Sequence, residues 1–177
     1  MLPIYEVSIG ELDAISLVQR PAIEQDFMLF SKQEEMKFSL DEEKHIVFGP
    51  ALIAEKPIYR VSPSGEEYYV VFTAEVIEHL FTQYMKNKVS NYSLEHSGEN
   101  IDGVYLIESF IKRKGLQPIG FESVSDGSWF ISLKVENEEA WEQLKAGKIK
   151  GFSVECLGQL EPRESEIDKL INSILDE

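Results

Sequence analysis

Along the chain, stretches in which apolar and polar residues alternate outnumber stretches with helical spacing. A period of two places alternate side chains on one face of a strand, so each such stretch predicts a half-buried strand. The clearest two are rich in aromatic and β-branched residues, which favour strands, and they are residues 67–72 and 128–135. Further strands are expected at residues 4–9, 14–19, 36–40, 44–48, 56–61, 104–111 and 151–157, and Gly49–Pro50 is expected to end the one before it.

Helical spacing of apolar residues is confined to three segments. Thr73 is expected to cap a helix that ends near residue 86 or 88, where lysines suit the negative end of the helix dipole. Asn137 is expected to cap a short helix, which Gly147 would end. Residues 164–175 are expected to form a last amphipathic helix.

The predicted elements follow one another mostly as strand after strand, with few helices between them. This order is unlike the regular alternation of a doubly wound α/β sheet. We therefore expect an α+β, mainly β fold: a curled antiparallel or mixed β-barrel of about eight strands with peripheral helices. Residues 1–160 would form this barrel domain, and residues 161–177 a C-terminal amphipathic helix that packs on the same domain or on a partner.

Charge and composition narrow the function classes. The 177 residues include 17 basic and 32 acidic side chains, a formal net charge of −15, which repels nucleic-acid phosphates and anionic lipid. No apolar run approaches the roughly 20 residues that cross a bilayer, and the N-terminus lacks the pattern of a signal peptide. We therefore expect a soluble cytoplasmic protein that binds neither nucleic acid nor membrane.

Cofactor and metal chemistry find little support in the sequence. Cys156 is the single cysteine, which excludes an internal disulfide and a cysteine-based metal cluster. The three histidines, His45, His79 and His96, are spread without a short ligand spacing, and no phosphate-binding glycine motif is present. We expect neither a cofactor nor a metal, and we expect His45 and His79 to be ordinary structural or surface residues.

Ser153 is the candidate nucleophile. It stands two residues after Gly151 in a short apolar strand, and a nearby glycine lets a substrate approach the backbone closely. A serine in a strand most often only hydrogen-bonds the backbone. Glu155 occupies the place of the second glycine of a Gly-x-Ser-x-Gly elbow, which disfavours the α/β-hydrolase fold but leaves serine chemistry open.

His96 is the candidate base, because it is the one histidine in a polar, loop-like stretch, residues 91–97. A histidine base needs a partner that fixes its tautomer and stabilises the imidazolium. Glu108 ranks first because it interrupts an apolar strand, where a carboxylate must be paired or line a cleft. Glu155 is the competitor, because its spacing places it on the same face as Ser153. A dyad oriented by water or a backbone carbonyl is the third alternative.

Several short segments within residues 12–157 match a known family in content and order. They are residues 14–24 (Ala-Ile-Ser-Leu-Val-Gln-Arg-Pro-Ala-Ile-Glu), 48–53, 57–60, 69–72, His96, 107–111 and 147–155. In these segments the chain resembles the phage prohead (capsid-maturation) serine proteases, in the XkdF-like branch, which are related to the herpesvirus assemblin-type proteases. The resemblance implies a β-barrel ringed by helices, in agreement with the predicted strands.

The resemblance also implies an activity and a place. The family cleaves scaffold and capsid proteins inside the immature prohead in the bacterial cytoplasm, usually with self-cleavage. By this analogy His96 would deprotonate Ser153, and a backbone N–H near Val154 would contribute to the oxyanion hole. The third catalytic residue would be Glu108, ahead of Glu155.

The partners implied are phage capsid and scaffold proteins as substrates, and a homo-oligomer is left open. The competing hypothesis is a catalytically inactive capsid-assembly or scaffold-type interaction module with the same fold. The apolar face of residues 164–175 would then be its partner-binding element.

Overall fold

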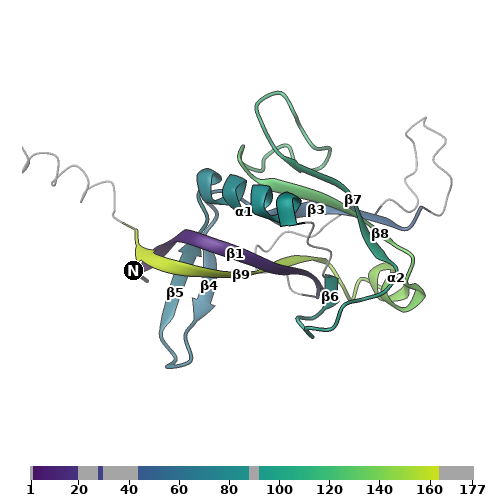
Figure 1. The fold of residues 1–177 in the computed structure, drawn as a ribbon, viewed down its shortest axis with the longest axis horizontal. Coiled ribbons are helices and arrows are strands. Elements are labelled where there is room, and N and C mark those ends of the chain that lie inside the picture. Colours follow the sequence, from purple (N-terminus) through teal and green to yellow (C-terminus); the bar gives the residue numbers. More distant parts are fainter. Residues whose placement is uncertain (1, 20–27, 30–43, 88–91, 164–177) are drawn as a thin grey trace, which may run out of the picture.

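The structure, a computed structural model, describes residues 2–19, 28–29, 44–87 and 92–163 (Figure 1). In these residues nine strands form two sheets, and two helices accompany them. In chain order the elements are β1 (Ile4–Val18), β2 (Met28–Leu29), β3 (Ile46–Leu52), β4 (Ile58–Val61), β5 (Glu67–Val71), α1 (Ala74–Asn87), β6 (Tyr92–Leu94), β7 (Val104–Ile111), β8 (Trp129–Val135), α2 (Glu138–Lys145) and β9 (Gly151–Pro162).

The long strand β1 is the centre of the first sheet. It pairs antiparallel with β9 along almost its whole length, and two register shifts interrupt this ladder. Its other edge is shared by two strands that run parallel to it, β5 near its start and β6 near its end. The strand β4 completes a hairpin with β5. Residues from both ends of the chain therefore lie side by side in one curved pair of strands (Figure 1).

The second sheet is antiparallel, in the order β2-β3-β8-β7. Its strand β3 continues through Gly49–Pro50 to Leu52, so the predicted strand end at this dipeptide is wrong. Proline is tolerated where its missing N–H leaves no ladder bond unmade. Among the described residues β2 pairs only with Val47 and Phe48, and the ladder to β8 shifts register just after Pro50.

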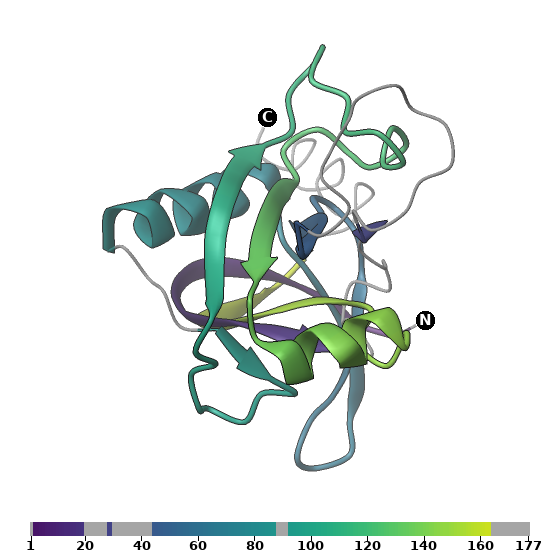
Figure 2. The ribbon, with the colours of Figure 1, turned by 90° about the vertical axis from the view of Figure 1, so that its right-hand side faces the viewer.

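The core lies where the two sheets and α1 meet. The strand β8 is buried along almost its whole length, and α1 contacts both β1 and β8. Figure 2 shows β7 and β8 crossing the direction of β1 and β9, with α2 beside the end of β8. The largest fully buried side chains come mainly from β8, α1, β9 and β1 and include Trp129, Tyr84, Phe130, Phe152, Ile15 and Leu17.

The helix boundaries follow the predicted caps. The Thr73 hydroxyl accepts a hydrogen bond from the Val76 N–H at 3.3 Å, and the Asn137 side chain accepts one from the Ala140 N–H at 2.9 Å. Gly147, at φ +66°, follows α2 and donates its N–H to the Leu144 carbonyl at 3.0 Å. These three predictions are confirmed.

The predicted mainly β class is confirmed, with mixed pairing in one sheet and antiparallel pairing in the other. The pairings found among the described residues do not close into a barrel, so the assemblin-like barrel stays a prediction. The two strands expected at 4–9 and 14–19 are one strand, and β6 falls in a stretch expected to be a loop. The strand expected at 36–40 and the helix expected at 164–175 lie outside the described residues.

The expected boundary between residues 160 and 161 falls within β9, which extends to Pro162. Neither helix in the described part of the chain is long and apolar enough to cross a membrane.

Candidate functional site

Three serines from distant parts of the sequence stand side by side in the first sheet. Ser16 of β1 is the register partner of Ser93 in β6 and of Ser153 in β9. We call these three residues the serine row. All three are buried, with exposed fractions of 0% for Ser16, 3% for Ser93 and 7% for Ser153. Because side chains alternate along a strand, the row lies on the face opposite the core residues Ile15 and Phe152.

Glu155 extends this polar face, since it stands two residues after Ser153 on β9. The Ser16 Oγ donates a hydrogen bond to Glu155 Oε1 at 2.5 Å, and the Oγ atoms of Ser16 and Ser93 are 2.6 Å apart. The hydrogen bond from Ser16 lowers the pKa of Glu155; partial burial opposes this shift, and His96 and Ser93 add to it. Glu155 is therefore held as a carboxylate at neutral pH.

His96 meets this carboxylate directly. Its Nδ1 lies 3.0 Å from Glu155 Oε1, with side-chain exposures of 45% for His96 and 32% for Glu155. A carboxylate bound at Nδ1 fixes which ring nitrogen carries the proton, and it directs Nε2 to a different partner. The structure thus orients the imidazole in the way that a histidine base requires.

The loop that carries His96 has an unusual backbone. Glu95 and His96 follow one another in the left-handed region, at φ +48° and φ +58°. This conformation costs a residue other than glycine roughly 1–2 kcal/mol. Two hydrogen bonds join this loop to the end of β1 and the residue after it. The Glu95 N–H donates to the Leu17 carbonyl at 3.1 Å, and the Gln19 N–H donates to Glu95 Oε1 at 2.5 Å. Strain held in place by the surrounding structure is a feature of functional sites.

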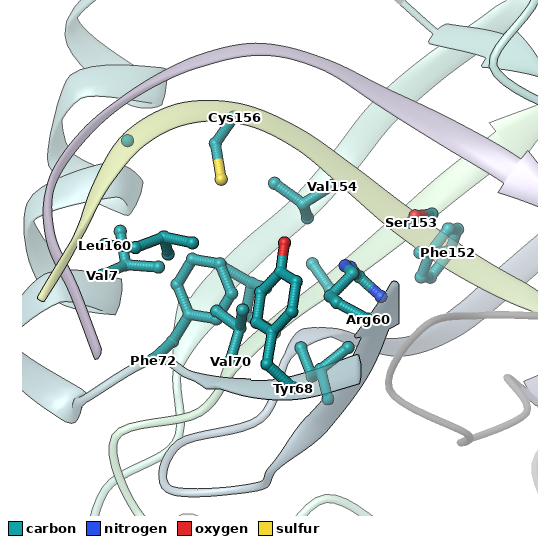
Figure 3. Close-up of a pocket in the computed structure, with 14 residues that line it drawn as sticks. Val7, Arg60, Tyr68, Val70, Phe72, Phe152, Ser153, Val154, Cys156 and Leu160 are labelled. Carbon is teal, nitrogen blue, oxygen red and sulfur yellow. The ribbon is translucent and has the colours of Figure 1, made fainter. Parts of the chain in front are cut away.

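Ser153 differs from the other two members of the serine row. Its hydroxyl makes no hydrogen bond to any of the described residues, whereas Ser16 and Ser93 are bound to each other. Ser153 also contributes to a cavity of about 230 Å³ between β9 and the β4–β5 hairpin, which lies on the Phe152 and Val154 face of β9, opposite the side chains of the serine row (Figure 3). Of the three serines, Ser153 is the one whose hydroxyl has no hydrogen-bond partner among the described residues.

The structure places the other candidate carboxylate elsewhere. Glu108 lies on β7, the outer strand of the second sheet, where it is exposed and accepts a hydrogen bond from the Ser132 hydroxyl. An exposed carboxylate on an outer strand is solvated, so it needs no histidine partner. The structure brings Glu155, and not Glu108, to His96. Which of the two acts in catalysis stays a prediction.

His45 has structural contacts. The His45 ring stacks on Trp141 with ring centres 4.3 Å apart, and its Nδ1 lies 3.1 Å from the Val135 carbonyl oxygen. Over the described ranges, no group of three or more His, Cys, Asp or Glu side chains could hold a metal ion.

Sequence reasoning missed Ser16 and Ser93. Each is a single polar residue inside an apolar stretch, Ala-Ile-Ser-Leu-Val and Tyr-Ser-Leu. The alternation does place both on the face opposite their apolar neighbours. Nothing in either stretch shows that the two serines meet, since they are 77 positions apart.

Ser16→Ala tests whether this network holds Glu155 ionised. We expect the pKa of Glu155 to rise toward its ordinary value, since the hydrogen bond that favours the carboxylate is lost. The measurement is an NMR titration of the Glu155 side-chain carboxyl. Ser93→Ala is the matched control and should shift the titration less, because the Ser16–Glu155 contact remains. An unchanged Glu155 titration in Ser16→Ala would contradict the assignment.

At neutral pH, Ser16→Ala should lower the free energy of unfolding by about 1–2 kcal/mol. This is the low end of the range for a hydrogen bond to a charged group, because the site is partly exposed to solvent. The folded-state pKa of Glu155 lies below the unfolded value. Its contribution to stability is therefore present above the unfolded pKa and is lost as the pH falls through the folded pKa. The difference between wild type and Ser16→Ala should accordingly shrink in acid, as urea denaturation at several pH values will show.

A histidine held by a carboxylate, on the same sheet as a serine whose hydroxyl makes no hydrogen bond among the described residues, is an arrangement typical of serine hydrolases. Comparison with known proteins gives the same class. The chain matches, over residues 37–161, a family model described as "Putative phage serine protease XkdF". The chain belongs to this XkdF family of phage serine proteases.

A curated relative is the phage-like element PBSX protein XkdF of Bacillus subtilis strain 168, which is 29% identical over 134 residues. The matched region covers 76% of this chain and 42% of that protein, so the chain spans less than half the length of the relative. No solved structure matches the chain.

Proposed function

We propose that the chain is a serine endopeptidase of phage head assembly, with Ser153 as nucleophile, His96 as general base and Glu155 as the carboxylate that orients His96. The observation that carries this proposal is the 3.0 Å contact between His96 Nδ1 and Glu155 Oε1, made from the strand that also carries Ser153. Membership of the XkdF family supports the reaction class.

The proposed reaction begins when the Ser153 Oγ attacks the scissile carbonyl and His96 Nε2 takes the Ser153 proton. The same imidazolium then donates this proton to the leaving amine, and water completes the cycle by the reverse steps. Glu155 stabilises the imidazolium without accepting its proton, in keeping with its lowered pKa. Substrate binding completes the approach of His96 to Ser153, as is common for sites that are loose without substrate.

Backbone donors provide the remaining stabilisation in this proposal. A backbone N–H near Val154 would bind the oxyanion, and such a donor is typically worth roughly 3–4 kcal/mol. In the described part of the chain β9 hydrogen-bonds with β1 alone, so its second edge can pair with an extended peptide. A peptide bound in this way would lie along the strand that carries Ser153.

The substrates we propose are the capsid and scaffold proteins of the same phage, together with the protease itself. Cleavage would take place inside the immature head, in the host cytoplasm. The support is that the family is described as phage serine proteases and that the Bacillus relative is named as a protein of a phage-like element. We also propose that the two observed sheets belong to a closed barrel, as in the assemblin-type proteases.

Covalent labelling tests the proposal without knowledge of the substrate. A fluorophosphonate should label the purified chain at Ser153, as located by peptide mass mapping. His96→Gln should slow labelling by about 10²- to 10⁴-fold, since the base is lost. The matched control is His79→Gln on α1, which should label at the wild-type rate.

If the chain is instead a catalytically inactive assembly module, the fluorophosphonate should not label it. The proposal is wrong if Ser153 stays unlabelled both in the isolated chain and in the chain co-expressed with its capsid protein. It is also wrong if labelling occurs at a different serine.

A further inference from the structure

Most of the residues that line the cavity beside Ser153 have apolar side chains. β9, the β4–β5 hairpin and β3 all contribute to it (Figure 3). Its apolar lining includes Val7, Leu52, Ile58, Val70, Phe72 and Leu160. Arg60 is the one basic side chain among the lining residues, all of which lie in the described part of the chain. A charged side chain among apolar residues is costly unless it has a binding partner.

Arg60 reaches the cavity because of its place on β4. The neighbouring positions Tyr59 and Val61 are exposed, whereas Ile58 is buried, so Arg60 shares the inward face with Ile58. Across the hairpin its register partner is Tyr68, which also lines the cavity. Figure 3 shows the Arg60 guanidinium between Tyr68 and the end of the cavity where Ser153 lies.

Most of the hydrogen-bond donors of the Arg60 guanidinium have no acceptor among the described residues. It donates one hydrogen bond, from Nη1 to the Tyr59 carbonyl at 3.1 Å, and no carboxylate pairs with it in the ranges that the structure describes. A guanidinium carries five N–H donors in a planar fork that matches a carboxylate. The chain has 32 acidic and 17 basic residues, so carboxylates that could pair with an arginine are abundant. Arg60 nevertheless has no carboxylate partner in these ranges.

We propose that this cavity is a substrate subsite that binds an acidic side chain, aspartate or glutamate, through Arg60. The inference rests on the proposed endopeptidase function and names the specificity of that site. The apolar walls contact the methylene part of the side chain, and the Arg60 fork binds its carboxylate. A peptide paired with the unpaired edge of β9 points alternate side chains to opposite faces of the sheet, so one of them enters the cavity on the Phe152 and Val154 face.

The same chemistry disfavours other side chains. A lysine in this cavity would place two like charges together in a partly dry space. A glutamine has the shape of glutamate but lacks the charge, so it loses the charge-assisted hydrogen bonds. The comparison of glutamate with glutamine therefore isolates the contribution of Arg60.

Cleavage of a synthetic peptide library, mapped by mass spectrometry, tests the subsite. With the wild-type chain we expect aspartate or glutamate to be enriched at one position relative to the scissile bond. For a cleaved peptide, changing that residue from glutamate to glutamine should lower kcat/KM by about 10- to 100-fold. In Arg60→Glu the preference at this position should change to lysine or arginine, and in Arg60→Gln the preference for acid should disappear.

The control is Arg113→Glu, which changes the charge equally at an exposed site paired with Glu78, outside the cavity lining. It should keep the wild-type preference. Cleavage without an acidic preference, or with one that survives in Arg60→Glu and Arg60→Gln, overturns the subsite but leaves the endopeptidase intact.

Labelling of Ser153 without cleavage of any acidic peptide also counts against the subsite, since the library contains the side chain it should select. Absence of both labelling and cleavage overturns the endopeptidase function itself.

Discussion

We expect Ser153→Ala to abolish processing of a co-expressed capsid protein, with a fall in rate of roughly 10⁴- to 10⁶-fold, because the proposed nucleophile that forms the acyl-enzyme is lost. The fold should be unaffected. The Ser153 hydroxyl makes no hydrogen bond among the described residues, so its removal should change the free energy of unfolding by less than about 1 kcal/mol. Processing is followed by gel electrophoresis and mass spectrometry, and stability by urea denaturation.

The matched control for this result is Ser8→Ala. Ser8 is also a strand serine of the first sheet, but its hydroxyl donates to the Gln159 carbonyl at an exposed position. Ser8→Ala should process the capsid protein at the wild-type rate. Wild-type processing by Ser153→Ala would remove Ser153 from the mechanism, whatever the labelling experiment shows.

We expect Glu155→Gln to lower kcat by roughly 10³- to 10⁴-fold with a small change in KM. The amide keeps the shape of the side chain, but it can present an N–H to His96 Nδ1 and so stabilise the wrong tautomer. It also removes the charge that stabilises the imidazolium. The contact being tested is the 3.0 Å approach of His96 Nδ1 to Glu155 Oε1. The measurement is steady-state kinetics on a peptide from the library described above.

Glu108→Gln is the opposing variant. Glu108 is exposed on β7 and accepts a hydrogen bond from Ser132, a contact that glutamine can keep through its carbonyl oxygen. We expect kcat to remain within about threefold of wild type, as for most exposed substitutions. If Glu108→Gln proves the more damaging change, Glu108 orients the base after all. If neither variant slows turnover, His96 and Ser153 act as a dyad.

The predictions that succeeded from sequence depend on local interactions. The caps at Thr73 and Asn137 follow from side chains that bind backbone groups within three residues, and such contacts form whatever the rest of the fold does. The mainly β class follows from a period-two pattern that each strand carries in itself. The Pro50 prediction failed because the cost of a proline in a strand depends on whether its N–H faces a partner strand.

The ranking of the two carboxylates shows the limit of local reasoning. Glu108 ranked first because an acidic residue inside an apolar strand is costly if it is buried unpaired. Burial, however, is a property of the assembled sheet. As the outermost described strand of its sheet, β7 leaves Glu108 exposed, whereas β9 pairs with the central strand β1 and so brings Glu155 to Ser16.

What the sequence determined by itself is therefore the class of fold, the helix ends, and the shared face of Ser153 and Glu155, since a spacing of two has the same consequence in any strand. Only the tertiary structure decided that Ser16, Ser93 and His96 gather around Glu155. These contacts come from β1 pairing with β6 and with β9, strands far apart in the chain. Such pairings form because both apolar faces are buried together, and no single segment carries that information.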